Sequence, residues 1–420
     1  MKMYALYDAP DLPKLEYNHR KYCDKHKIEY NKILYSGSLS EKYSYILACL
    51  QKNIGNVLFF IDNFSFFKTF DILPELKEDM FIQKDKEKIF DNFFIVKSNQ
   101  ETIRIFEEAL HSINQIGFFG KDWKKAAAQM SFPSEKCLAY PHQEKTGQYV
   151  NISLSRHSNA YEIGNVLVVN FIHHHQENEG NYFAEVACSI PQKQYSVPLE
   201  KYECFNPGQK TAFVTLYTPN IENLGIISEE NIKKYCIEHS ITYHIYRDTT
   251  NELKKENISG TWAKPWLLFN HFYNHENIIW IDSDILLSKN YKIETSLDIA
   301  VYKDPVVFFN AGYMFFKTNE KNKDLLNCVI KKLKQIDGVL EGVYNHGGDQ
   351  PRFIEAVKEF YPEYSPLSST LGNMHPVYPI SVSPYRADTM IHFMGFDKNL
   401  RCAIMAGYNE ILISQYETSI

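Results

Sequence analysis

The sequence repeats itself, and this repeat limits what the chain can fold into. "KYCDKHKIEY" at 21–30 recurs as "KYCIEHSITY" at 234–243, an offset of 236 − 23 = 213. "VLFFIDN" at 57–63 recurs as "IIWIDSD" at 278–284, an offset of 282 − 62 = 220. Insertions in loops between two copies of one domain produce such a drifting offset. The 420 residues therefore predict two related domains, 1–203 and 211–420, joined near "CFNPGQK" at 204–210.

Each copy alternates strand-like and helix-like segments. In the second copy, "TAFVTLY" at 211–217 and "NIIWID" at 277–282 are apolar runs typical of buried strands. Between them, "AKPWLLFNHFYNH" at 263–275 has apolar residues at helical spacing. This alternation predicts the α/β class, with a Rossmann-like, mostly parallel sheet in each of two tandem domains. In such sheets, ligands bind at the carboxyl ends of the strands.

Charge and cysteine content exclude several classes of protein. A net charge of −6 provides no overall field that attracts nucleic acid. The eight cysteines are scattered without a CxxC pair, which indicates reduced thiols and a cytoplasmic protein. We expect no signal peptide in "MKMYALYDAPDLPK" and no run of the ~18 apolar residues that a membrane span requires. The sequence is compatible with peripheral contact with the inner membrane and with a homodimer.

Two acidic residues follow the apolar run at 277–281. Side chains at positions i and i+2 of an extended segment face the same way, so Asp282 and Asp284 are expected to point together into the ligand crevice. Two adjacent carboxylates repel each other unless a cation lies near them. A divalent ion with oxygen ligands, bridging to phosphates, fits this pattern. The alternative is a pair of solvated surface acids, but Trp280 and Ile281 lead straight into the pair and place it at a core edge.

Three further motifs follow this pair in order. "WIDSDILLSKN" at 280–290 is followed by "FNAGYMFFKTN" at 309–319, "GGDQPRF" at 347–353 and "IHFMGFDK" at 391–398. Over about residues 211–400 this set resembles the DxD-containing GT-A glycosyltransferases, and in particular the galactosyl/mannosyl-transferase and xyloglucan xylosyltransferase family. Bacterial lipooligosaccharide galactosyltransferases and glycogenins are also similar. The resemblance implies a GT-A fold and a retaining hexosyltransferase. Its expected substrates are a nucleotide-sugar, such as a UDP-hexose, and a glycan acceptor, such as capsule or lipooligosaccharide.

The resemblance also implies roles for individual residues. The metal ligands for Mn²⁺ or Mg²⁺ would be Asp282, Asp284 and His392, with contact to the nucleotide ribose as the alternative role of Asp282. The residues expected at the donor are Lys264, Asn310, Gly312, Gly395 and Lys398, and those expected at the transferred sugar are Asp349 and Gln350. Alternatively, Asp349 caps the helix that follows it. The segment "GFDK" lacks the cysteine of the xylosyltransferases, and Lys398 is followed by Asn399 instead of Pro-Trp, so the identity of the donor stays open.

The first copy lacks most of these residues. Asp62 matches Asp282 and Asp122 matches Asp349. The positions of Ser283, Asp284, Gln350, His392 and Gly395 instead carry Asn63, Phe64, Trp123, Asn170 and His173. We therefore predict a degenerate first domain without a metal site, whose role is glycan binding, dimer or membrane contact, or structural support. The "HHH" run in "FIHHHQENEG" at 171–180 is more typical of a solvated loop than of a metal site. Two rival functions stay open for the whole chain: a non-catalytic glycan-binding protein and a Mg²⁺-dependent phosphohydrolase.

Overall fold

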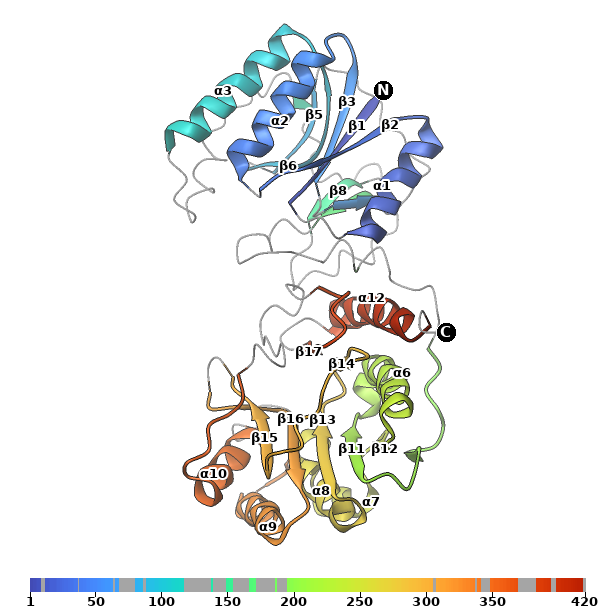
Figure 1. Cartoon of the computed structure of the whole chain (residues 1–420), viewed down its shortest axis with the longest axis vertical. Helices are drawn as coiled ribbons and strands as arrows, with labels where there is room; N and C mark the ends of the chain where they lie inside the picture. The colour runs from blue at the N-terminus through green and yellow to red at the C-terminus, as the bar shows by residue number, and fades with distance from the viewer. Residues whose placement is uncertain are drawn as a thin grey trace. The chain divides into compact units, whose positions relative to one another are not determined.

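The chain forms two compact units, Met1–Ser189 and Ile190–Ile420, in a computed structural model (Figure 1). The structure describes residues 1–8, 12–36, 38–62, 65–67, 80–85, 88–116, 137–138, 149–153, 166–170, 186, 195–304, 307–336, 338–340, 348–368, 383–393 and 398–417. Within these ranges, no helix combines the length and the apolar character needed to cross a membrane.

The second unit is built on a six-stranded mixed sheet. Its strands lie in the order β10 (Tyr202–Phe205), β12 (Ile241–Tyr246), β11 (Thr211–Leu216), β13 (Asn277–Ile281), β16 (Asn310–Lys317) and β15 (Ile299–Tyr302). The central strands β12, β11 and β13 are parallel, as expected for βαβ units. The outer pairings, β10 with β12, β13 with β16 and β15 with β16, are antiparallel. The connection between β15 and β16 is too short for the crossover that a parallel pair requires. The Rossmann-type, GT-A-like fold class is confirmed, with antiparallel strands added at both edges.

Helices cover both faces of this sheet (Figure 1). On one face, buried residues of α6 (Glu222–His239) pack against the sheet. On the other face lie α8 (Lys264–His271), α9 (Glu320–Lys334) and α10 (Gln350–Phe360). The C-terminal α12 (Lys398–Glu417) packs on α6, where Asn409 Nδ2 donates to Glu230 Oε2 at 3.0 Å. Short helices α7 (Asn251–Lys255), η3 (Pro219–Ile221), η4 (Gly260–Ala263) and η5 (Phe272–Asn274) complete the connections.

A two-stranded ribbon lies beyond the carboxyl end of β13. In it, β14 (Ile285–Leu287) pairs antiparallel with β17 (Met390–His392). The register places Ile285 opposite His392. This pairing brings a residue from near the end of the chain to the segment that directly follows Asp284.

The first unit has the same plan. Its main sheet has the order β2 (Glu29–Leu34), β1 (Lys2–Tyr7), β3 (Val57–Asp62), β6 (Lys88–Lys97), β5 (Met80–Asp85) and β7 (Cys137–Leu138). A second sheet contains β4 (Ser65–Phe67), β9 (Val166–Asn170) and β8 (Tyr149–Ser153). Residues of α2 (Leu39–Lys52) and α3 (Gln100–Ile116) pack on one face of the main sheet, and α1 (Pro13–His26) contributes Cys23 against Met3.

The sequence repeat recurs in individual hydrogen bonds. In the first unit, Asn18 Oδ1 on α1 accepts from Phe67 N at 2.8 Å. In the second unit, Asn231 Oδ1 on α6 accepts from Leu287 N at 2.7 Å. The offsets, 231 − 18 = 213 and 287 − 67 = 220, equal those of the helix and strand repeats in the sequence. The two units therefore share one internal arrangement of strands and helices.

The boundary between the units differs from the sequence estimate. The sequence analysis ended the first domain at residue 203, whereas the compact units divide between Ser189 and Ile190. The reason is β10, whose residues Tyr202–Phe205 pair antiparallel with β12 and form the edge of the second sheet.

Candidate functional site

Asp282 and Asp284 lie in the tight turn that joins β13 to β14. Asp282 N donates to Gly312 O at 2.8 Å, and Phe393 N donates to Asp284 O at 2.9 Å. The backbone of the pair is thereby bound to β16 on one side and to the residue after β17 on the other. The two carboxylates converge because of this turn, and not because an extended strand continues through them as the sequence analysis assumed.

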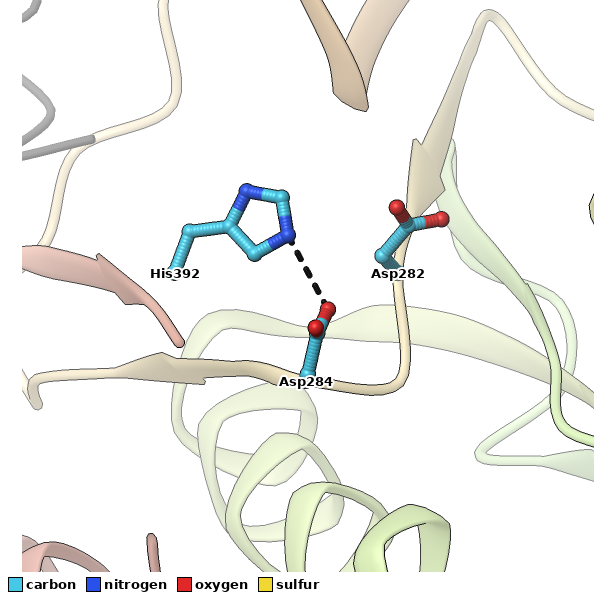
Figure 2. A group of neighbouring side chains, drawn as sticks. All are labelled: Asp282, Asp284 and His392. Atoms are coloured by element: carbon cyan, nitrogen blue, oxygen red, sulfur yellow. Dashed lines mark hydrogen bonds and ion pairs between the residues drawn. The ribbon is translucent and has the colours of Figure 1, made fainter. Parts of the chain in front are cut away.

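The turn brings both acids to His392 (Figure 2). One ligand atom from each of Asp282, Asp284 and His392 lies within 4.8 Å of the other two. His392 Nε2 is 3.0 Å from Asp284 Oδ1, and the imidazole is buried. Burial alone would raise the pKa of Asp284, but the neighbouring His392 and Arg401 outweigh it and lower that pKa below its usual value. Asp284 is therefore an ionised carboxylate beside an imidazole, a donor pair that suits Mn²⁺ or Mg²⁺.

Gly312 on β16 makes room for the imidazole. A Cβ atom at this position would lie 2.3 Å from His392 Cε1 and 2.8 Å from Asn310 Oδ1. Asn310 Oδ1 in turn accepts from Gly312 N at 2.8 Å. Only glycine allows the ring this close to the strand, so β16 sets the position of His392 at the acidic turn. Within the described part of the chain, His392 Nδ1 is buried without a hydrogen-bond partner.

Lys264, at the start of α8, forms a bridge between two acids. Its Nζ lies 3.2 Å from Asp282 Oδ1 and 3.2 Å from Asp349 Oδ2, and it donates to Ala311 O at 3.2 Å. The side chain is only 4% exposed. Burial works against its charge, but the two carboxylates raise the pKa of Lys264 above its usual value. Three acceptors at this distance match the three donors of an ammonium group, so this lysine positions acidic residues of the site.

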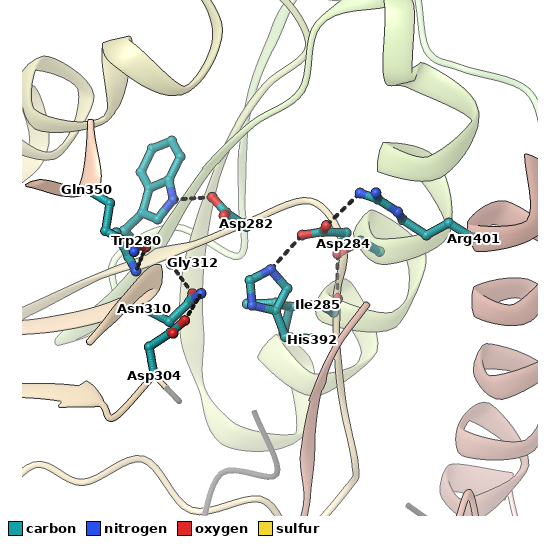
Figure 3. A network of polar contacts seen from close by, with 12 residues as sticks. Trp280, Asp282, Asp284, Ile285, Asp304, Asn310, Gly312, Gln350, His392 and Arg401 are labelled. Atoms are coloured by element: carbon teal, nitrogen blue, oxygen red, sulfur yellow. Dashed lines mark hydrogen bonds and ion pairs between the residues drawn. The ribbon is translucent and has the colours of Figure 1, made fainter. Parts of the chain in front are cut away.

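Trp280 also holds the carboxylate of Asp282 in place (Figure 3). Its indole Nε1 donates to Asp282 Oδ1 at 2.7 Å. Together with Lys264, this bond holds one oxygen of Asp282 against the protein. The other oxygen, Oδ2, is therefore the one that can turn to a ligand.

The motif at 349–350 begins α10 beside β16. Gln350 Oε1 accepts from Ala311 N at 2.9 Å, and the side chain of Asp349 is buried beside Lys264 and makes no capping hydrogen bond. Burial raises the pKa of Asp349, although Lys264 acts in the opposite direction. The structure thus places Asp349 and Gln350 at the same edge as the acidic turn.

Two residues of this network had not been singled out in the sequence. Asp304, buried just after β15, accepts from Asn310 Nδ2 at 3.3 Å. Arg401 on α12 donates from Nη1 to Asp284 Oδ2 at 2.9 Å (Figure 3). The only sequence signal for Arg401 is its place one helical turn after Lys398, at the end of the last motif.

Some predicted positions lie outside the described residues. These are Gly395 and, in the first unit, Asn63, Phe64, Asp122, Trp123, His173 and the segment 171–180. Lys398 begins α12, but its side chain is not described. In the first unit, Asn170 lies opposite Ser65, at the register that His392 occupies opposite Ile285.

The first unit has a lysine–aspartate pair like that of Lys264 and Asp282. Asp62 ends β3, as Asp282 follows β13, and it is 3.4 Å from Lys42 Nζ on α2. Both side chains are buried. Lys42 and Lys264 lie on the equivalent helices of the two units, so the lysine–aspartate pair is common to both.

No protein-family model and no curated protein matches the chain. A comparison with solved structures does find similar folds. A glycosyltransferase involved in glycosylation of the major capsid of PBCV-1 is 17% identical, with 46% of this chain and 98% of that chain covered and a TM-score of 0.37. The galactosyltransferase LgtC, in complex with donor and acceptor sugar analogs, is 12% identical, with coverage of 48% and 95% and a TM-score of 0.35. The bifunctional glycosyltransferase WbbM is 10% identical, with 99% of both chains covered and a TM-score of 0.35. The similarity is to glycosyltransferase folds, and values this low assign neither activity nor substrate to this chain.

Proposed function

We propose that the chain is a metal-dependent glycosyltransferase that moves a hexose from a nucleotide-sugar to a glycan acceptor. The observation that carries this proposal is the convergence of Asp282, Asp284 and His392 at the carboxyl edge of a Rossmann-like sheet. Nucleotides bind at this edge in such folds. Two carboxylates and an imidazole form a donor set suited to Mn²⁺ or Mg²⁺.

The metal would be held by Asp282, Asp284 and His392, and the metal would in turn contact the diphosphate. A bound divalent ion supplies charge neutralisation on the leaving diphosphate. Asp284 and His392 offer ligand atoms 3.0 Å apart, and Asp282 offers Oδ2 to the metal or to the nucleotide ribose, since Trp280 and Lys264 contact its Oδ1. Lys398, at the start of α12, would add a second positive contact to the diphosphate.

The sugar would lie against β16 and the start of α10. Asn310 and Gly312 line this edge, and Gln350 Oε1 is bonded to Ala311 N, which leaves its amide NH₂ to donate to a sugar hydroxyl. Asp349 offers its second oxygen as an acceptor or as charge for an oxocarbenium-like transition state. The choice of UDP-hexose, of retention, and of a capsule or lipooligosaccharide acceptor rests on the family resemblance.

A thermal-shift experiment tests this function. UDP-, GDP- and CMP-sugars, with and without Mn²⁺, are added to the full chain and to Asp284→Ala; Asp324→Ala, which removes an exposed acid on α9, is the matched control. We expect stabilisation that requires both Mn²⁺ and one nucleotide-sugar class, and that disappears only in Asp284→Ala. Stabilisation by glycans alone would favour a binding protein. Phosphate release from phosphate esters without sugar transfer would favour a phosphohydrolase.

For the first unit, we propose a domain without metal-dependent transfer. The support is the asparagine at the register of His392 and the engagement of Asp62 with a buried lysine. Asp62→Ala should leave Mn²⁺-dependent donor binding unchanged. A folded Asp62→Ala chain that no longer binds the donor would overturn this assignment.

A further inference from the structure

Both oxygens of Asp284 have side-chain partners (Figure 3). His392 Nε2 lies 3.0 Å from Oδ1, and Arg401 Nη1 donates to Oδ2 at 2.9 Å. The side chain of Asp284 is 15% exposed and that of Arg401 is 25% exposed. A cation that binds Asp284 beside His392 therefore competes with Arg401 for the negative charge of the same carboxylate.

The position of Arg401 is set by a well-anchored helix. It lies in the first turn of α12, whose buried residues include Ile404, Met405 and Tyr408. The helix is also bonded to α6 through Asn409 and Glu230. The backbone that carries Arg401 is therefore fixed by packing, whereas the long side chain can change partner by rotation about its own bonds.

We propose that Arg401 is a diphosphate-binding residue of the donor site, paired with Asp284 until a divalent metal takes over that carboxylate. This inference rests on the proposed function. A metal ion on Asp284 neutralises the carboxylate and repels the adjacent guanidinium. A planar guanidinium then offers two parallel donors to phosphate oxygens. The partial positive charge at the start of α12 favours an anion at the same place.

The simpler alternative is that Arg401 only supports Asp284. The two roles predict opposite effects on the metal. If Arg401 competes with the metal, removing its charge tightens metal binding in the absence of nucleotide. If Arg401 supports Asp284, removing it disorders a metal ligand and weakens metal binding.

The test measures two affinities by titration calorimetry on the full chain. The first is for Mn²⁺ alone, and the second is for UDP at saturating Mn²⁺. For Arg401→Gln we expect Mn²⁺ to bind up to about 5-fold more tightly, the equivalent of one partly exposed ion pair. We expect UDP to bind about 10-fold to 100-fold more weakly, the equivalent of a lost charge-assisted bond to phosphate.

Two variants serve as controls. Arg401→Lys keeps the charge and should retain part of the UDP affinity that Arg401→Gln loses. Arg386→Gln removes an exposed arginine that pairs with Asp388 in the same unit, and it should change neither affinity. Weaker Mn²⁺ binding by Arg401→Gln, or unchanged UDP binding, would overturn the proposal. A wild-type chain that binds neither Mn²⁺ nor a nucleoside diphosphate would instead refute the proposed function itself.

Discussion

Gly312→Ala should weaken metal binding, although it replaces none of the proposed metal ligands. The added Cβ would lie 2.3 Å from His392 Cε1, and ordinary contact begins at 3.4 Å, so the ring must move by about 3.4 − 2.3 = 1.1 Å. Metal–ligand distances are maintained within about 0.2 Å. A displacement of this size removes the imidazole from the coordination sphere. We expect Mn²⁺ affinity to fall by about 10-fold to 100-fold, and overpacking to lower the free energy of unfolding by about 1–3 kcal/mol.

A second glycine provides the matched control. At Gly225 on α6, a Cβ would lie 2.3 Å from the Tyr217 ring, which is the same clash outside the metal group. Gly225→Ala should destabilise the second unit by a similar amount and leave Mn²⁺ affinity unchanged. The measurements are Mn²⁺ titration followed by electron paramagnetic resonance, and urea unfolding. If Gly312→Ala binds Mn²⁺ as wild type does, the contact between β16 and His392 does not position a metal ligand.

Three further predictions concern buried titratable side chains. His244 and His271 are buried, and burial with neighbouring histidines lowers their pKa values to about 3 and about 4. The unfolded chain takes up these protons near pH 6.5, so stability is complete above that pH and falls below it by up to about 1.4 kcal/mol per pH unit for each histidine. Urea unfolding of His244→Asn between pH 5 and 7.5 should show a shallower dependence, and an unchanged one would contradict this. Lys264→Met leaves Asp349 buried without its cation and should cost about 3–5 kcal/mol in the second unit, measured as a lower unfolding midpoint. Lys42→Met should destabilise the first unit by a similar amount and leave Mn²⁺ affinity unchanged. A loss of Mn²⁺ affinity in Lys42→Met would refute the proposal that the first unit takes no part in metal binding.

The repeat predicted much of the fold because it is carried by local patterns. The apolar run before Asp282 and the matching run before Asp62 both form the third strand of a parallel trio. The direction of β15 and β16 could not be predicted, because it depends on the connection between them and not on their composition. The short edge strand Tyr202–Phe205 was missed for a similar reason: its pairing with β12 is a tertiary contact.

For the site, the motifs predicted the residues that the structure brings together, Asp282, Asp284 and His392, but not the contacts that hold them in place. Asp284 and His392 are 108 residues apart, and their meeting requires the β14–β17 pairing, which no local spacing encodes. Arg401, 117 residues from Asp284, was missed because a single arginine in a helix is usually a surface residue. The resemblance suggested a donor contact for Lys264, which stays a prediction, and the buried bridge that this lysine forms between two carboxylates was not predicted.

The central claim is that one metal ion binds at the acidic turn of the second unit. The most direct measurement is anomalous scattering at the manganese edge from crystals grown with Mn²⁺ and UDP. The account predicts a peak coordinated by Asp284 and His392, with UDP phosphate oxygens completing the shell and the Arg401 guanidinium turned toward them. A peak ligated by other side chains, or UDP bound at this edge with no metal on Asp284, would contradict it.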